Sequence, residues 1–234
     1  MKRQRLIVIL GPTAVGKTAL SIQLAHKLRT EIISGDSMLV YRGFDIGTAK
    51  PDAKDQDGIR HYLLDILDAD ESFSVVDFCA QAAKHIKDIN ENGHIPIQAG
   101  GTGLYIKSLL EGYQFNETPG HEAFRQQLET LAAQHGKEYV HAMLAEVDPA
   151  AAERLQVNNF RRVVRALEVC HFGQESISQE KIHDGSVLVY DAYVVGICRE
   201  RQALYARINR RVELMFGAGR LLGVPRVWCR QKPL

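Results

Sequence analysis

Residues 6–18 read LIVILGPTAVGKT, a short apolar run followed by a glycine-rich stretch. The apolar run contains β-branched residues and ends at Gly-Pro, which is typical of a buried parallel strand that enters a loop. The second part fits the pattern G-x-x-x-x-G-K-[ST] in full, with a strand before it and a helical pattern after it. The stretch therefore predicts a phosphate-binding loop made of Gly11, Pro12, Thr13, Ala14, Val15, Gly16, Lys17 and Thr18.

Each part of this loop has a physical role in binding phosphate. The glycines let the backbone curl so that consecutive N–H groups point inward, and the N-terminus of the following helix adds a partial positive charge. Lys17 supplies a full positive charge, and we expect Thr18 to ligate Mg²⁺. The loop predicts a diphosphate or triphosphate ligand. A chance match on a surface turn is disfavoured by the flanking strand and helix.

The remaining pattern predicts an α/β fold in which a P-loop parallel sheet is flanked by helices. Strands are expected at residues 6–10, 31–34, 94–98 and 187–197, and helices from residue 17, at 74–92 and at 199–216. The last helix is basic, with an expected buried face of Leu204, Ile208, Val212 and Met215. Ligands bind at the carboxyl ends of parallel strands, so we expect Asp36 and Thr102 to face the same crevice as the loop.

The middle of the chain has a different pattern. From about residue 122 to residue 179 we expect helices, such as 124–135 and 139–146, without a strand between them. The expected organisation is a P-loop core over residues 1–115 and 185–219, a helical insertion over 116–184, and an atypical tail over 220–234.

Composition limits the class of protein. A chain of 234 residues with 45% hydrophobic content can bury a core as one domain with an insertion. No apolar run approaches the roughly 18 residues that span a bilayer, and the cysteines show no C-x-x-C spacing. We therefore expect a cytoplasmic protein that contacts no membrane and has neither a zinc site nor disulfides.

Charge is unevenly distributed along the chain. Residues 1–153 contain 15 basic and 21 acidic residues, a formal charge of −6, whereas residues 154–220 contain 11 basic and 7 acidic residues, a charge of +4. A basic half indicates either a polyanionic partner such as nucleic acid or simply solvated helix faces. Charge alone does not choose between these two interpretations.

Three further segments decide between possible phosphate ligands. They read ISGDSMLVYRG at 33–43, DIGTAKP at 45–51 and GGTGLY at 100–105. Together they closely resemble the tRNA dimethylallyltransferase family, and the resemblance continues through FSVVDF at 73–78, VDPAAA at 147–152 and RALEV at 165–169. It implies transfer of a dimethylallyl group from dimethylallyl diphosphate to N6 of an adenosine beside the anticodon, at tRNA position 37, with Mg²⁺ and release of diphosphate.

The resemblance also implies roles for single residues. The exocyclic N6 of adenine is a poor nucleophile unless a base removes its proton during attack, so a carboxylate is needed near the loop. Asp36 matches the family's base, Thr102 matches the residue that holds N6 by a hydrogen bond, and Arg207 and Arg211 match arginines near the reaction centre. From the residues alone, turn capping by Asp36 and a satisfied loop hydroxyl at Thr102 remain open.

A base in a tRNA loop must be pulled out of its stack to react, so the protein must hold RNA backbone. The resemblance implies contacts to the anticodon stem-loop, partly from the helical insertion, by a protein that we expect to be a monomer. The implied tRNA-binding residues are Asp36, Ser37, Met38, Leu39, Arg125, Arg161, Arg162, Val163, Val164 and Arg165. For the arginines, the alternative is an exposed charge without a phosphate contact.

The sequence departs from the family at two places. Asn159-Phe160-Arg161-Arg162 stands where the family usually has Asp-Pro-Gln-Arg, and the motif resemblance ends near Gly219. In the tail, Gly223 and Pro225 oppose a helix. We therefore expect a shortened chain with an altered tail, whose activity stays open. Two alternatives remain: a P-loop kinase of a small molecule or nucleoside, which would consume ATP or GTP, and a tRNA-binding form without activity.

Overall fold

The computed structural model describes residues 3–113, 118–173 and 188–217. The chain divides into two compact units, Met1–Gly112 with Gly185–Leu234, and Tyr113–Asp184. We call them the core unit and the helical unit, and each is described by itself. The expected tail over 220–234, and the end of the expected helical insertion beyond residue 173, lie outside the described residues.

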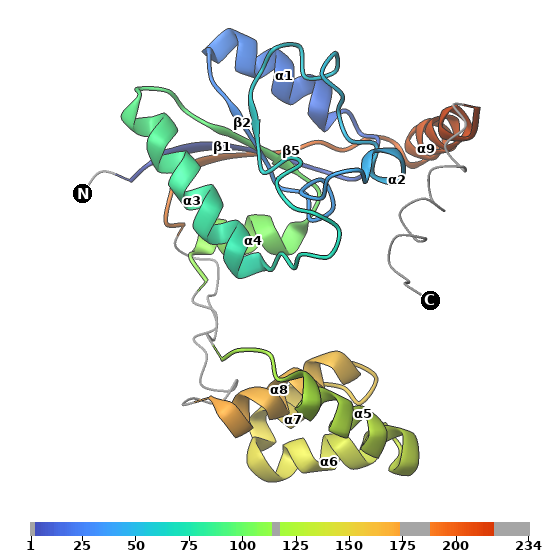
Figure 1. Ribbon diagram of the computed structural model, residues 1–234. Helices are drawn as coiled ribbons and strands as arrows, with labels where there is room; N and C mark the ends of the chain where they lie inside the picture. The colour runs from blue at the N-terminus through green and yellow to red at the C-terminus, as the bar shows by residue number, and fades with distance from the viewer. Residues whose placement is uncertain (1–2, 114–117, 174–187, 218–234) are drawn as a thin grey trace. The chain divides into compact units, whose positions relative to one another are not determined.

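A five-stranded parallel sheet forms the centre of the core unit (Figure 1). Its order is β3-β2-β4-β1-β5, with β1 at Arg5–Leu10, β2 at Ile32–Ser34, β3 at His61–Tyr62, β4 at Ile97–Gly100 and β5 at Asp191–Gly196. Leu10 pairs in register with both Gly100 and Gly196, so the carboxyl ends of three strands meet at one edge. The predicted parallel α/β fold is confirmed.

Helices cover both faces of this sheet. Because side chains alternate along a strand, Val8 and Ile9 belong to different apolar clusters. Ile9 packs in the cluster with Ile22 and Ala25 of α1 (Lys17–Leu28), whereas Val8 packs in the cluster that contains α3 (Val75–Glu91) and α4 (Gly103–Glu111). The layers are therefore α1, sheet, then α3 with α4, as Figure 1 shows.

Two expectations about elements of the core unit need correction. β4 begins at Ile97 instead of residue 94, because the N–H of His94 still bonds to the carbonyl oxygen of Ile89 and completes the end of α3. Helix α9 (Arg201–Gly217) has no fully buried face: Leu204, Ile208 and Met215 are half-buried, and Val212 is 41% exposed. The expected face is therefore only partly buried, and the hydrogen bonds that join α9 to earlier loops come from its arginines.

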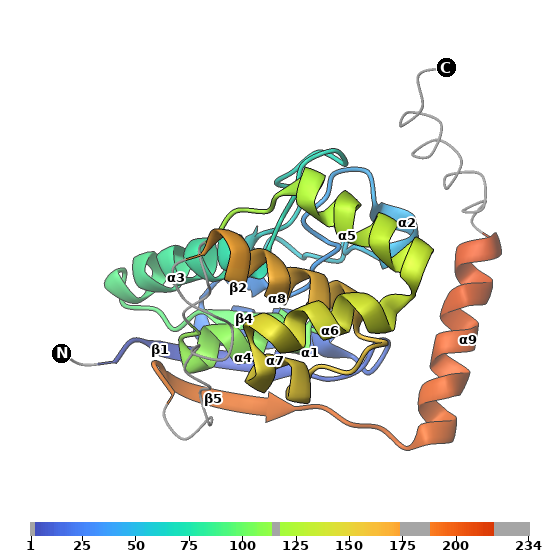
Figure 2. The ribbon, with the colours of Figure 1, turned by 90° about the horizontal axis from the view of Figure 1, so that it is seen from below.

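The helical unit contains α5 (Glu122–His135), α6 (Lys137–Val147), α7 (Pro149–Arg154) and α8 (Phe160–Phe172). α5, α6 and α8 pack side by side (Figure 2) around a core that includes Leu128, Val140 and Leu144. α7 begins at Pro149, because Asp148 accepts a hydrogen bond of 3.0 Å from the N–H of Ala151 and Pro149 fills the first helical turn. None of the helices described in either unit is long and apolar enough to cross a membrane.

Candidate diphosphate-binding and transfer site

The predicted loop joins β1 to α1 and has the backbone geometry of an anion site. Gly16 has φ of 115° and Ala14 has φ of 63°, so both residues lie in the left-handed region. For alanine this conformation costs about 1–2 kcal/mol, a strain that is typical of functional loops. Gly16 precedes α1 without a side-chain cap. The first N–H groups of α1 thus lack an intrahelical acceptor and can bind an anion.

Lys17 lies at the mouth of this loop. Its Nζ donates hydrogen bonds of 2.8 Å to the carbonyl oxygen of Gly11 and 2.9 Å to that of Pro12. Burial lowers the pKa of Lys17, and the nearby carboxylate of Asp36 partly opposes this effect. The ammonium group is therefore held at the start of the loop, within electrostatic reach of Asp36.

A pocket of about 470 Å³ opens beside the loop. It brings together residues from five separate parts of the chain, among them Ala14, Lys17, Thr18, Asp36, Thr48, Ala49, Gly100, Arg207, Arg210 and Arg211. Four cationic side chains line it, and Asp36 is the one acidic residue among the lining residues. A concave site with this excess of positive charge fits a multiply charged anion.

Asp36 reaches the pocket because two backbones approach closely behind it. A Cβ at Gly100 would lie 2.2 Å from the carbonyl oxygen of Gly35, so only glycine allows β4 to end there. Asp36 Oδ1 accepts a hydrogen bond of 2.9 Å from the N–H of Met38. Within the described part of the chain no hydrogen bond reaches Oδ2. The turn-capping interpretation therefore holds for one oxygen and leaves the other available.

Thr102 does not line the pocket, but it contacts Ser37, the neighbour of the lining residue Asp36. Its Oγ1 accepts a hydrogen bond of 3.1 Å from the N–H of Ser37 and lies 3.4 Å from the hydroxyl of Ser37. Of the other residues expected beside Asp36, Leu39 lines the pocket and Met38 is 45% exposed. Thr102 thus ties the loop after β4 to the segment that carries Asp36.

The arginines of α9 are hydrogen-bonded to two loops of the pocket. Arg207 Nε donates to the carbonyl oxygen of Ala14 at 2.9 Å, and Arg211 Nη2 lies 3.4 Å from the carbonyl oxygens of Thr48 and Ala49. Arg210 also lines the pocket. The family resemblance does not include Arg210. Its position next to Arg211 on a basic helix could have indicated that it also faces the pocket.

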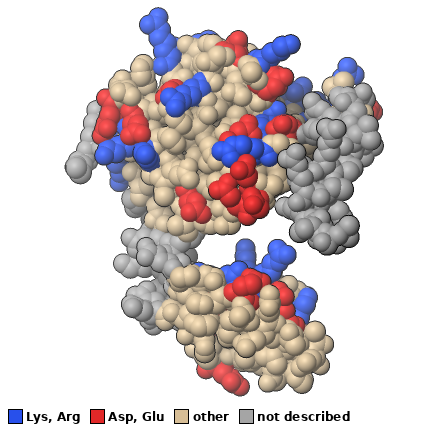
Figure 3. All heavy atoms as spheres, in the orientation of Figure 1, with Lys and Arg blue, Asp and Glu red and all other residues tan. Residues whose placement is uncertain are grey.

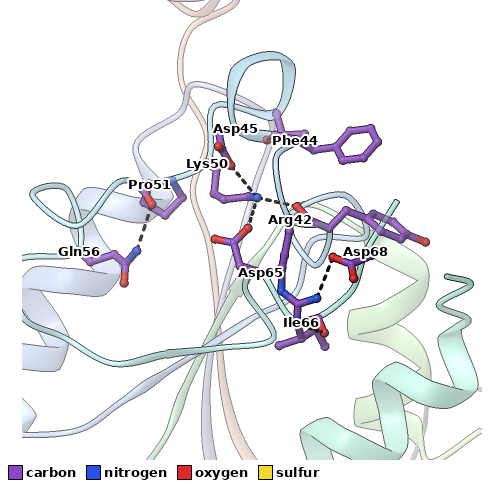
Figure 4. A network of polar contacts seen from close by, with 11 residues as sticks. Arg42, Phe44, Asp45, Lys50, Pro51, Gln56, Asp65, Ile66 and Asp68 are labelled. Carbon is purple, nitrogen blue, oxygen red and sulfur yellow. Dashed lines mark hydrogen bonds and ion pairs between the residues drawn. The ribbon is translucent and has the colours of Figure 1, made fainter. Parts of the chain in front are cut away.

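A polar network around Lys50 lies next in the chain to the pocket residues Thr48, Ala49 and Pro51 (Figure 4). The Lys50 side chain is 3% exposed and makes ion pairs with Asp45, at 2.8 Å, and with Asp65. Its Nζ also donates to the carbonyl oxygen of Tyr41 at 2.6 Å. These contacts fix helix α2 (Asp45–Thr48) and the pocket residues that follow it. Residue-level reasoning missed Lys50, because a lysine in a loop is usually exposed.

In the helical unit, two arginines that the resemblance assigns to tRNA bind a buried carboxylate. Glu168 is fully buried; Arg125 donates two hydrogen bonds of 2.8 Å to it, and Arg165 donates one of 2.6 Å. Burial alone would raise the pKa of Glu168, but hydrogen bonds from Arg125, the N–H of His121 and Arg165 lower it to about 2. Arg125 and Arg165 therefore stabilise the helical unit itself.

The remaining residues expected to bind tRNA differ in how far their side chains are exposed to solvent. Val163 and Val164 are buried in the core of the helical unit, at 0% and 6% exposure, which leaves only their backbone for a ligand. Arg161 and Arg162 are exposed on the same helix. On the face drawn in Figure 3, basic and acidic side chains of the described residues are interspersed and form no broad basic patch.

Comparison with known proteins points to one family. The family model for IPP transferases matches residues 39–232. The tRNA dimethylallyltransferase of Bacillus anthracis is 50% identical over 230 residues, which cover 98% of this chain and 73% of that protein. The family-model match extends past Gly219 into the tail.

Solved structures agree. The tRNA isopentenylpyrophosphate transferase of Bacillus halodurans matches with a TM-score of 0.66 and 41% identity, over 98% of this chain and 71% of that one. A eukaryotic dimethylallyltransferase acting on tRNA matches with a TM-score of 0.82 and 30% identity, over 96% of this chain and 56% of that one. These matches do not favour a small-molecule kinase. The chain belongs to the tRNA dimethylallyltransferase, or IPP transferase, family.

Proposed function

We propose that this protein transfers a dimethylallyl group from dimethylallyl diphosphate to N6 of the adenosine at position 37 of tRNA, and releases diphosphate. One observation carries the proposal: a phosphate-binding loop with Lys17 and the carboxylate of Asp36 line the same pocket. The transfer needs an anion-binding site for the diphosphate next to a group that can accept a proton. The names of the relatives in the same family support the choice of substrates.

The diphosphate is the leaving group in this reaction. The loop N–H groups, Lys17 and the guanidinium groups of Arg207 and Arg211 surround its binding place. As the bond between the allylic carbon and the diphosphate oxygen breaks, negative charge accumulates on that oxygen. Fixed positive groups lower the energy of this state more than that of the intact ester, because they require no reorganisation during the reaction.

Asp36 is the proposed base. N6 of the adenosine attacks the allylic carbon, and the N–C bond forms while the C–O bond breaks. The N6 proton passes to Oδ2 of Asp36, the oxygen that does not cap the turn at Met38. We propose that Thr102 acts beside it, by holding N6 directly or by fixing Ser37 next to Asp36.

Mg²⁺ fits the oxygen donor present at this place. The hydroxyl of Thr18 lines the pocket, and a hard oxygen ligand of this kind suits Mg²⁺. The described residues contain no cluster of three or more His, Cys, Asp or Glu side chains suited to a metal. When bound, Mg²⁺ would neutralise charge on the diphosphate.

Binding of the anticodon stem-loop is also part of the proposal. Arg161 and Arg162 are the arginines of the helical unit best placed to contact RNA phosphates, because both are exposed. Arg125 and Arg165 keep 39% and 34% of their side-chain surface exposed while they bind Glu168, so each can add a phosphate contact. Met38 adds an exposed apolar side chain next to Asp36.

The test is a direct transfer assay. The protein is incubated with unmodified tRNA, Mg²⁺ and dimethylallyl diphosphate, and the nucleosides are analysed by mass spectrometry. We expect a prenylated adenosine at position 37 and an equal amount of released diphosphate. Consumption of ATP or GTP without tRNA would support the kinase alternative, and salt-sensitive tRNA binding without product would indicate a binding protein without activity.

A further inference from the structure

A second pocket, also of about 470 Å³, lies on the other side of the phosphate loop. Its walls come from Gly11 and Pro12 of the loop, from Gly101 and Gly103 after β4, and from α4 with Leu110 and Glu111. The charged residues that line it are Lys107 and Glu111, and neither Lys17, Asp36 nor any arginine does. Its chemistry therefore differs from that of the diphosphate pocket.

Glu111 gives this pocket an unused hydrogen-bond acceptor. The residue is only 9% exposed, and its Oε2 is buried without a hydrogen-bond partner in the part of the chain that the structure describes. A buried polar atom without a partner is destabilising, and most such atoms in folded proteins are satisfied. A ligand with an N–H donor would satisfy it.

The other walls are formed mostly by backbone and apolar side chains. Gly101 and Gly103 present bare backbone, and a Cβ at Gly103 would meet no atom within 4 Å. The ring of Pro12 and the side chains of Ile106 and Leu110 add apolar surface. A mostly apolar pocket that contains the carboxylate of Glu111 and is also lined by Lys107 fits a nucleobase that carries an exocyclic amino group, since carboxylates accept hydrogen bonds from such groups.

The place of the pocket indicates which base would enter it. A Cβ at Gly101 would lie 3.8 Å from Lys17 Nζ and 3.9 Å from the carbonyl oxygen of Gly11, so little more than backbone separates the two pockets. We propose that the second pocket binds an unpaired, amino-bearing base of the tRNA loop close to the reacting adenosine, and that Glu111 accepts a hydrogen bond from its amino group. This inference rests on the proposed function, because that function supplies the RNA.

The experiment measures binding of anticodon stem-loops by fluorescence anisotropy. In each stem-loop one loop base lacks its amino group: purine riboside replaces adenosine, inosine replaces guanosine, and pyrimidin-2-one riboside replaces cytidine. For the wild-type protein we expect one position other than the reacting adenosine to weaken binding roughly tenfold or more, as for a hydrogen bond to a charged group. In Glu111→Leu the same substitution should have no further effect, because the acceptor is gone.

Two controls make the result specific. Glu91→Leu removes an exposed carboxylate of α3 and should leave the base preference unchanged. The melting temperature of Glu111→Leu should equal or exceed that of the wild type, since the change removes a buried, unpaired oxygen. Gly103→Val, which adds bulk to the wall of the pocket without backbone strain, should weaken binding of the unmodified stem-loop.

The inference is overturned if no loop position other than the reacting adenosine shows a Glu111-dependent effect. It is also overturned if Glu111→Leu changes the KM for dimethylallyl diphosphate and leaves RNA binding intact, which would assign the pocket to the prenyl chain. Because binding is measured directly, absence of prenyl transfer in the wild type would refute the proposed function without deciding this test.

Discussion

Arg207 Nε donates a hydrogen bond of 2.9 Å to the carbonyl oxygen of Ala14, a residue 193 positions earlier in the chain. Ala14 is the strained, left-handed residue of the phosphate loop. The contact joins the last described helix to the loop that opens the fold. The shape of the proposed diphosphate site therefore depends on α9 as well as on the loop motif.

Arg207→Lys should weaken the site although it keeps the charge. Lysine lacks the planar fork of donors that lets one arginine bind Ala14 and a ligand oxygen together. We expect kcat/KM for dimethylallyl diphosphate to fall roughly tenfold to a hundredfold, the effect of one lost charge-assisted hydrogen bond. The matched control is Arg201→Lys on the same helix, whose guanidinium bonds to Tyr205. Equal kinetics for the two variants would contradict a role for Arg207.

Asp36→Asn should separate chemistry from binding. The amide keeps an oxygen that can accept the bond from the N–H of Met38, so the turn should stay intact. It cannot take a proton, and loss of a general base typically lowers the rate by about 10²–10⁴-fold. We expect this loss in kcat, while calorimetry shows diphosphate affinity close to that of the wild type. Full activity of the variant would exclude Asp36 as the base.

The sequence predicts the fold and the centre of the site because both depend on local patterns. The β-branched run, the loop motif and the position of Asp36 just after the strand at 31–34 follow from spacing and residue type alone. What remained hidden depends on contacts between distant segments: the close approach of Gly100 to Gly35, the burial of Lys50, and the pairing of Arg125 with Glu168. The sequence alone does not show whether a charged side chain, such as that of Arg125, pairs with a buried group of opposite charge in the fold.

Lys50→Met should loosen the wall of the pocket. The change leaves Asp45 and Asp65 without their shared cation, although both are partly exposed, at 62% and 44%, so water compensates for part of the loss. We expect the unfolding free energy to fall by about 1–3 kcal/mol and the KM for dimethylallyl diphosphate to rise more than kcat falls. Thermal melts and steady-state kinetics measure both effects.

A control for Lys50→Met is Lys87→Met, which removes an exposed lysine whose partner Glu91 lies 3.8 Å away. That change should alter stability by less than about 1 kcal/mol, because exposed ion pairs contribute little. An unchanged KM in Lys50→Met would show that the network supports the fold without shaping the pocket.

The buried carboxylate of Glu168 predicts an acid-sensitive helical unit. Its pKa is lowered from the usual 4.5 to about 2. A group with a depressed pKa in the folded state contributes stability above its unfolded pKa, and this contribution disappears as the pH falls through the folded pKa. Glu168 should therefore stabilise the protein fully above pH 4.5, by on the order of 3 kcal/mol, and progressively less from there down to about pH 2.

Glu168→Gln tests this expectation, because glutamine has nearly the same shape and does not titrate. At neutral pH it leaves Arg125 and Arg165 without their buried counter-charge, so we expect a melting temperature clearly below that of the wild type. The difference should shrink as the pH is lowered from 4.5 to 2, since protonation of Glu168 produces the same loss. Glu153→Gln, at an exposed position of α7, should show no such pH-dependent difference. A constant gap between Glu168→Gln and the wild type over this range would mean that the carboxylate does not titrate there.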